Sequence, residues 1–211
     1  MTPTKQYYKN AAETVIKNLK KRNMEGYYAE TCEDAVAIAL SLMPEGSSIG
    51  WGGSVTLSEC GLMDAVKSGK YNIIDRDEAK TPAEAKELYT KIFNADFFLM
   101  STNAITYNGE LINVDGRSNR VSYLCYGPEN VIIVTGMNKL VVDVDEGIKR
   151  ARNVAAPKNT VRLKKKTPCS VTGKCADCLS PDCICMNTVI TRASRFEGRI
   201  KVILIGEELG Y

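Results

Sequence analysis

The chain of 211 residues contains no histidine. A zinc site with mixed cysteine and histidine ligands is therefore excluded, because it needs at least one imidazole. General acid–base chemistry would fall to aspartate, glutamate, lysine, tyrosine or cysteine. No pairing of a nucleophile with a base is recognisable in the sequence, so no catalytic residue is predicted.

The sequence also lacks long apolar runs and a strong charge of either sign. The longest apolar runs, such as residues 131–134 and 202–205, are far shorter than the roughly 20 residues that span a bilayer. Residues 1–9 have no apolar signal core. The net charge of +3 is too small to indicate a nucleic-acid partner. We therefore expect a cytoplasmic protein without a membrane span, whose thiols are reduced unless they hold a metal.

Five of the eight cysteines stand in one short segment, which is punctuated by Gly173, Ser180 and Pro181. This punctuation predicts neither a helix nor a strand, and thiolates on such a backbone are able to converge on one ion or cluster. The spacing leaves open a four-cysteine zinc site, an iron–sulfur cluster, reduced thiols without metal, and disulfides. The gaps differ from the regular two-residue gaps of bacterial ferredoxins, which counts against the cluster. The predicted ligands are Cys169, Cys175, Cys178 and Cys185, with Cys183 as a spare.

The patterns along the chain predict a single domain of the α/β class. Its parts are N-terminal helices in residues 1–45, an α/β core in 46–160, a basic linker and cysteine-rich loop in 161–186, and C-terminal strands in 187–211. Strands that alternate with helices predict a mainly parallel sheet covered by helices. The expected strands are residues 47–51, 71–74, 96–101, 131–135 and 201–205, and the last expected helix is 144–153. Asn108-Gly109 predicts a small antiparallel hairpin beside this sheet.

The strongest candidate for ligand binding outside the cysteines is residues 49–56, where a strand runs into glycines and then into a helix. Thr56 is predicted to be the N-cap of that helix. Gly52 and Gly53 allow close backbone approach, and Ser54 and Thr56 supply hydroxyls. These four residues are therefore predicted to bind an anion, with a tight turn that binds nothing as the alternative.

Further polar residues are expected at the same edge of the sheet. Asn103 and Lys139 each follow a predicted strand, and ligands of open α/β sheets collect beyond the carboxyl ends of the strands. Asp115, Asn119 and Arg120 are predicted to reach the same crevice, where Arg120 would pair bidentately with a carboxylate or phosphate. Local turn formation is the alternative for the aspartate and asparagines, and a surface position is the alternative for Lys139.

Taken in order, these segments resemble the LUD domain family of lactate-utilisation proteins, once known as a domain of unknown function. The matching stretches are residues 50–57, 102–106, 109–116, 119–121, 136–139, 168–185 and 206–211. The resemblance covers nearly the whole chain, from about residue 7 onward. The chain departs from the family pattern at Arg117-Ser118, in place of a more glycine-rich turn, and at Cys183, in place of a basic residue.

The resemblance implies a Rossmann-like three-layer fold similar to the sugar-phosphate isomerase and CoA-transferase group, in which a glycine loop contacts an anionic ligand. It also implies a link to L-lactate oxidation, iron–sulfur partner subunits, and compatibility with a homodimer. We expect a protein that binds a small anionic metabolite, a hydroxy acid or a phosphorylated compound, with zinc or an iron–sulfur cluster in its cysteine loop. No nucleotide cofactor is evident.

Two alternatives stay open. One is an isomerase or acyl/CoA transferase acting on a phosphorylated or CoA ligand, in which the metal loop is structural. The other is a redox sensor whose cysteines respond to oxidation and hold no metal.

Overall fold

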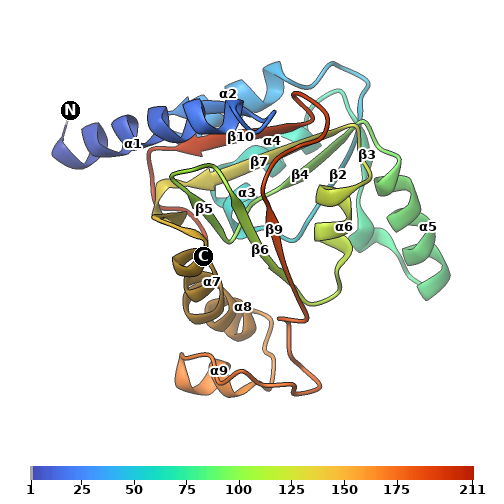
Figure 1. The fold of residues 1–211 in the computed structure, drawn as a ribbon. Coiled ribbons are helices and arrows are strands. Elements are labelled where there is room, and N and C mark those ends of the chain that lie inside the picture. The colour runs from blue at the N-terminus through green and yellow to red at the C-terminus, as the bar shows by residue number, and fades with distance from the viewer. Residues whose placement is uncertain (1) are drawn as a thin grey trace.

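The computed structural model describes residues 2–211, and within them two sheets are surrounded by helices (Figure 1). The larger sheet has six parallel strands, in the order β1 (Glu25–Ala29), β10 (Ile200–Ile205), β7 (Asn130–Gly136), β4 (Phe97–Met100), β2 (Ser48–Trp51) and β3 (Asn72–Ile74). The smaller sheet has the order β8 (Leu140–Val141), β5 (Ala104–Thr106), β6 (Leu111–Asp115) and β9 (Asn187–Thr191). The predicted α/β class and the mainly parallel sheet are confirmed.

Helices cover both faces of the large sheet. One face carries α1 (Pro3–Lys20), α5 (Pro82–Phe93) and α6 (Asn119–Cys125), and the other carries α2 (Cys32–Ser41), α3 (Val55–Glu59) and α4 (Leu62–Lys67). Successive side chains of a strand point to opposite faces. In β7, Val131 and Ile133 accordingly join the core under α1, whereas Ile132 and Val134 join the core under α2.

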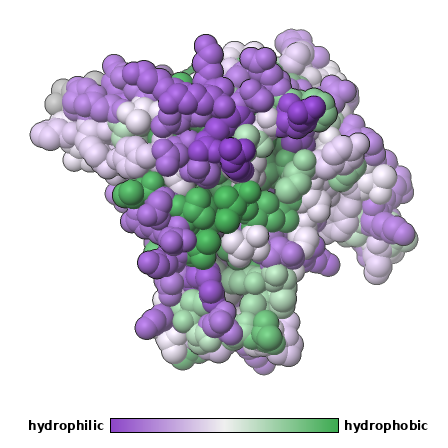
Figure 2. Space-filling model, viewed as in Figure 1, coloured by the Kyte–Doolittle hydropathy of each residue, from purple (hydrophilic) through white to green (hydrophobic). Residues whose placement is uncertain are grey.

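The predicted hairpin is confirmed and forms part of the small sheet. β5 and β6 are antiparallel, with Ala104 opposite Ile112, and β9 adds to the other side of β6 with Asn113 opposite Val189. The predicted C-terminal strands therefore separate, because β9 joins the small sheet and β10 joins the large one. Figure 2 shows apolar surface gathered over the middle of this face, where β5, β6 and β9 lie.

The helix after the glycine loop differs from its prediction in two ways. Ser54, not Thr56, is the N-cap, because its hydroxyl accepts a hydrogen bond from the amide of Leu57. The helix also stops after one turn and restarts as α4, because Gly61 lies in the left-handed region with φ of 78°, a conformation open to glycine. The prediction of Thr56 as the cap was wrong. The hydroxyl of Thr56 is therefore not used for helix capping.

The last helical region is longer than predicted. α7 (Val144–Arg150) continues through a π-helical turn (Ala151–Ala155) into α8 (Ala156–Arg162), and Pro157 is accommodated at the start of α8. The cysteine-rich segment contains a short helix, α9 (Pro168–Thr172), so the prediction of no helix was wrong at Cys169. Figure 1 shows α7, α8 and α9 projecting below the two sheets. No helix within residues 2–211 is long and apolar enough to cross a bilayer.

Candidate functional site

A cavity of about 670 Å³ lies at the carboxyl ends of β2, β4 and β7. This is the edge of an open α/β sheet at which ligands usually bind. The segments that follow these strands, together with α8 and the end of the cysteine-rich segment, form its walls. Of the nine residues predicted to bind a ligand, the lining includes Gly53, Ser54, Thr56, Asn103, Asp115, Asn119, Arg120 and Lys139.

Lys139 is a lysine of the cavity lining that is almost wholly buried, with 3% of its surface exposed. Its Nζ donates to Thr56 Oγ1 at 2.8 Å and to Ser101 Oγ at 3.0 Å. Burial lowers the pKa of Lys139 to about 7, and the positive charges of Arg150 and Arg120 lower it further, against an opposing effect of Glu59. A large share of the Lys139 amines is therefore neutral near pH 7.

The sheet itself brings these three side chains together. Ser101 follows β4, Thr56 lies in the first turn of α3 after β2, and Lys139 ends a 3-10 turn (Met137–Lys139) that follows β7. β4 pairs with both β2 and β7, so the three carboxyl ends are neighbours. The hydroxyl of Thr56, which does not cap its helix, is available to Lys139 because Ser54 takes the capping position.

Arg120 lies in the site but is fully occupied by the protein. Its Nη1 donates to the carbonyl of Ser101 at 3.2 Å and to Asn113 Oδ1 at 2.5 Å, and its Nη2 donates to the carbonyl of Val114 at 2.8 Å and to Asn103 Oδ1 at 3.3 Å. Its Nε lies 3.5 Å from Asp115 Oδ2. Since both terminal nitrogens of the guanidinium donate to the protein and its Nε is paired with Asp115, the expected bidentate pairing with a ligand would require breaking this network.

Asn103 and Asp115 also have structural contacts. Asn103 Oδ1 accepts from the amide of Val114 at 2.8 Å. Asp115 Oδ1 accepts from the amides of Arg117 and Ser118, at 3.0 and 2.8 Å, and so holds the turn that precedes α6. Turn formation, the alternative considered from the sequence, accounts for Asp115 in the structure.

The glycine loop contributes less of its backbone to the cavity lining than expected. Gly52 is absent from the cavity lining and packs beneath it, where a Cβ atom would lie 3.2 Å from Cδ of Arg120. Gly53 lies at the surface of the cavity, next to the guanidinium of Arg76. α3 spans only five residues, so its helix dipole is small, and the charge of the cavity comes from side chains.

Several lining residues were not predicted from the sequence. The basic and hydroxyl-bearing ones include Arg76, Ser101, Arg117, Arg162, Lys165 and Tyr211. Arg76 follows β3, so the strand-end rule applied to that strand would have identified it. Arg162 and Lys165 come from the segment predicted to be a solvated linker, and only the folding of α8 onto the cavity brings them there.

The cysteine-rich segment forms one wall of the same cavity, through residues that include Cys183 and Met186. Burial raises the pKa of Cys185 to about 12, and the neighbouring thiols of Cys183, Cys175 and Cys169 raise it further. Within residues 2–211, however, no group of three or more cysteine, aspartate or glutamate side chains is placed to hold a metal ion. The thiols as placed do not form a four-ligand site, and the predicted ligand set stays a prediction.

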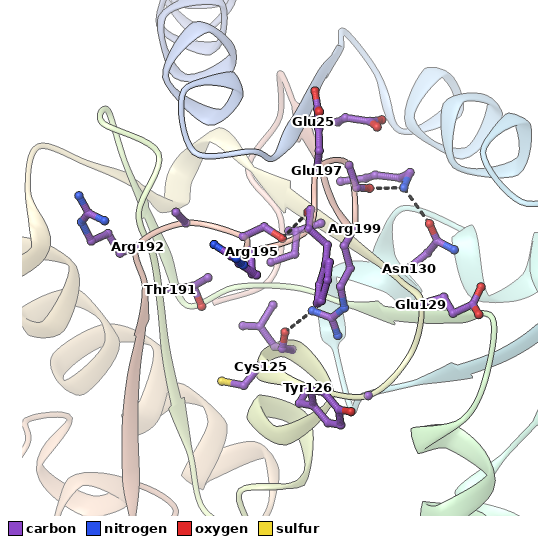
Figure 3. Close-up of a pocket in the computed structure, with 18 of the residues that line it drawn as sticks. Glu25, Cys125, Tyr126, Glu129, Asn130, Thr191, Arg192, Arg195, Glu197 and Arg199 are labelled. Atoms are coloured by element: carbon purple, nitrogen blue, oxygen red, sulfur yellow. Dashed lines mark hydrogen bonds between the residues drawn. The ribbon is translucent and has the colours of Figure 1, made fainter.

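A second cavity, of about 870 Å³, lies at the opposite, amino ends of β1, β10 and β7 (Figure 3). Its central basic residue, Arg199, donates to the carbonyls of Pro128, Leu124 and Tyr123 at 3.1, 2.7 and 2.9 Å. These bonds tie the strand β10 to the end of α6. Because Arg199 is used for this anchoring, we take the smaller cavity around Lys139 as the candidate site.

One solved structure is similar to this chain in fold over nearly the whole length of both. The solved structure of a DUF162 family protein from Deinococcus radiodurans has a TM-score of 0.54 at 13% identity, and the alignment covers 94% of this chain and 98% of that chain. Two further structures align over about half their lengths. eIF2B delta from Chaetomium thermophilum has a TM-score of 0.37 and 19% identity, covering 56% of this chain and 50% of that one. Ribose 5-phosphate isomerase from Plasmodium falciparum has a TM-score of 0.33 and 20% identity, covering 53% and 52%.

No curated protein matches the chain. The structure from Deinococcus radiodurans shows the shared fold alone, because its sequence identity is low. The family is shown by a family model, that of the LUD domain, which matches residues 12–205 and thus most of the sequence. The protein belongs to the LUD domain family.

Proposed function

We propose that the protein binds a small anionic metabolite at Lys139. The observation that carries this proposal is the environment of the buried amine. Among residues 2–211 its hydrogen-bond partners are the hydroxyls of Thr56 and Ser101, and no carboxylate pairs with it. A buried ammonium without a counter-ion is costly, so an anion that enters the cavity would stabilise the charged form of Lys139.

The charges that line the cavity support an anionic ligand. The basic lining residues are Arg76, Arg117, Arg120, Lys139, Arg162 and Lys165, and the acidic ones are Asp115 and Asp182. Both acids are already paired, Asp115 with Arg120 at 3.5 Å and Asp182 with Lys165 at 3.7 Å. The remaining basic side chains give the cavity a positive field that attracts anions.

Membership of the LUD family makes a 2-hydroxy acid such as L-lactate the first ligand to test. The carboxylate would accept from Lys139, and the hydroxyl would lie among the hydroxyls of Thr56 and Ser101. The cavity of about 670 Å³ is larger than a three-carbon acid needs, so it also admits phosphorylated compounds. Coenzyme A and inorganic phosphate therefore belong in the same test.

Isothermal titration calorimetry at low ionic strength, with L-lactate, inorganic phosphate and coenzyme A, tests the proposal. We expect at least one of these anions to bind the purified chain, and the Lys139→Met variant to bind it at least about tenfold more weakly. A charge-assisted hydrogen bond contributes about 1.5–3 kcal/mol, and 1.4 kcal/mol corresponds to a factor of ten. Binding should also weaken when salt is added.

Lys86→Met is the matched control, because Lys86 is an exposed lysine on α5 that lies outside the cavity lining. It should bind the anion as the unmodified chain does. Unchanged affinity in Lys139→Met, or no binding of any of the three anions, would contradict the proposal.

A more specific proposal is a redox role in hydroxy-acid oxidation, beside iron–sulfur partner subunits. It is supported by the position of the cysteine-rich segment, which places Cys183 in the wall of the cavity. The competing proposal of an isomerase or transferase predicts turnover of a phosphorylated or CoA ligand with no electron acceptor present, and an assay without acceptor separates the two.

A further inference from the structure

We propose that Lys139 is a nucleophile that captures 2-oxo acids as an imine in the cavity. This inference rests on the proposed function, because the same cavity must first admit a small anion. It goes beyond that function by assigning a covalent step and a carbonyl-bearing class of ligand to one residue.

The geometry provides what imine formation needs. The amine of Lys139 lies in the cavity lining, and its side chain is almost wholly buried, with 3% exposed. Two hydroxyls lie within hydrogen-bond distance of the nitrogen, at 2.8 and 3.0 Å. Desolvated lysines beside other cationic groups are the ones that proteins use as nucleophiles, because only the neutral amine has a free electron pair.

The charged groups around Lys139 favour this neutral form. Burial lowers the pKa of Lys139 most, Arg150 on α7 and Arg120 on α6 lower it further, and Glu59 on α3 raises it. Arg150 is itself held in place, since it donates to the carbonyls of Asn103 and Asn138 at 2.6 and 3.2 Å. The two guanidiniums are fixed by the fold, and so is their effect on the amine.

The reaction balances without a further reactant. The electron pair of Nζ forms a bond to the C2 carbon of the 2-oxo acid, and the electrons of the C=O double bond move to oxygen. Two protons from the amine reach that oxygen, with the hydroxyls of Thr56 and Ser101 placed to relay them. The C–O bond then breaks, water leaves, and a C=N bond joins Lys139 to the acid. Neither an oxidant nor a reductant is consumed.

The basic side chains of the cavity explain why an acid, and not a neutral ketone, would be captured. Arg76 lies beside Gly53 at the mouth of the glycine loop, and Arg162 comes from α8 on another wall. Arg76, whose Nε lies 3.6 Å from Asp77 Oδ1, can donate from its two terminal nitrogens to a carboxylate in a forked pair. In Arg162, Nε and Nη2 already donate to Asn159 Oδ1. The carboxylate of a 2-oxo acid is bonded directly to the carbonyl carbon. A guanidinium that binds the carboxylate therefore also positions the carbonyl carbon.

Borohydride trapping tests the inference on the unmodified chain. The protein is incubated with pyruvate, reduced with sodium cyanoborohydride, and analysed by intact mass and peptide mapping. We expect one reduced pyruvate adduct per chain, located on Lys139, and more adduct at pH 8 than at pH 6. L-lactate, which has no carbonyl, should form no adduct and should protect Lys139 when it is present in excess.

Two variants complete the experiment. Lys139→Arg cannot form an imine, so it should lose the adduct. Lys86→Arg should keep the adduct. If lactate, inorganic phosphate or coenzyme A binds but pyruvate labels only exposed lysines, or labels nothing, the inference is overturned while the proposed function stands. If none of these three anions binds and pyruvate forms no adduct, both fail.

Discussion

At the scale of single residues, the buried amine of Lys139 makes the stability of the fold depend on pH. Its pKa is about 7 in the folded chain and 10.5 when exposed. Between these values the unfolded chain binds more protons than the folded one, so the free energy of unfolding rises with pH. Each proton contributes up to about 1.4 kcal/mol per pH unit. Above pH 9 the raised pKa values of Cys32 and Cys185 act in the opposite sense.

We therefore expect the unmodified chain to gain about 1–2 kcal/mol of stability between pH 7 and pH 9 relative to Lys139→Met, which cannot titrate there. Urea denaturation of both proteins at several pH values measures this difference. Parallel stability curves for the two proteins across this range would show that the amine of Lys139 is not perturbed.

The sequence predicts some of the site residues and misses others for physical reasons. Asn103 and Lys139 reach the cavity because each follows a parallel strand, and strand ends converge whatever the details of packing. The role of Arg120 is not predictable, since its partners, among them Ser101 and Val114, come from segments that meet only after folding. The capping position could not be assigned either, because Ser54 and Thr56 are both good caps.

At the scale of elements, the contact between β2 and α5 depends on the absence of a side chain at Gly50. A Cβ atom at Gly50 would lie 2.7 Å from Cγ1 of Ile92, which is fully buried. The helix therefore approaches the strand more closely than any other residue at position 50 would allow. This approach also fixes where β2 ends and where the glycine loop begins.

We expect Gly50→Ala to destabilise the fold by about 1–3 kcal/mol, the usual cost of overpacking a core. In an Ile92→Ala background the same change should cost less than about 1 kcal/mol, because the clashing atoms are gone. A double-mutant cycle by chemical denaturation measures this coupling. Equal costs in the two backgrounds would place the strain elsewhere.

Element patterns were predictable where periodicity is strong. The expected strands at 47–51, 71–74, 96–101, 131–135 and 201–205 all occur, and so does the hairpin. The strand β1 and the helix α6 are not predicted by the pattern, because β1 is partly exposed along most of its length and α6 spans only about two turns. The π-helical turn that joins α7 to α8 has no recognised sequence signal.

At the scale of the whole molecule, the cysteine-rich segment forms part of the cavity wall. Residues 181–184 line the cavity, so a change in the thiols should be felt by the ligand. The sequence predicts that Cys169, Cys175, Cys178 and Cys185 bind zinc or an iron–sulfur cluster. We expect protein purified without oxygen to carry about one metal centre per chain, and the double variant Cys175→Ser, Cys178→Ser to lose it.

Measurement of iron, zinc and acid-labile sulfide, with titration of free thiols, checks this prediction. Removal of the metal by a chelator should also weaken anion binding, because the wall formed by residues 181–184 would loosen. Freshly prepared protein with no metal and with freely titrating thiols would contradict the prediction, and would favour a cysteine-based sensor instead.

The pairing of β1 with β10 has a consequence for how the protein is made. Glu25 lies beside Lys201, and within the large sheet β1 has no other neighbour. During synthesis on the ribosome, β1 cannot pair until β10 has emerged. The buried face of α1, which includes Val15 and Leu19, packs beside β1. This segment is translated before β10 and is thus completed late, and its apolar face lacks its partner strand until then.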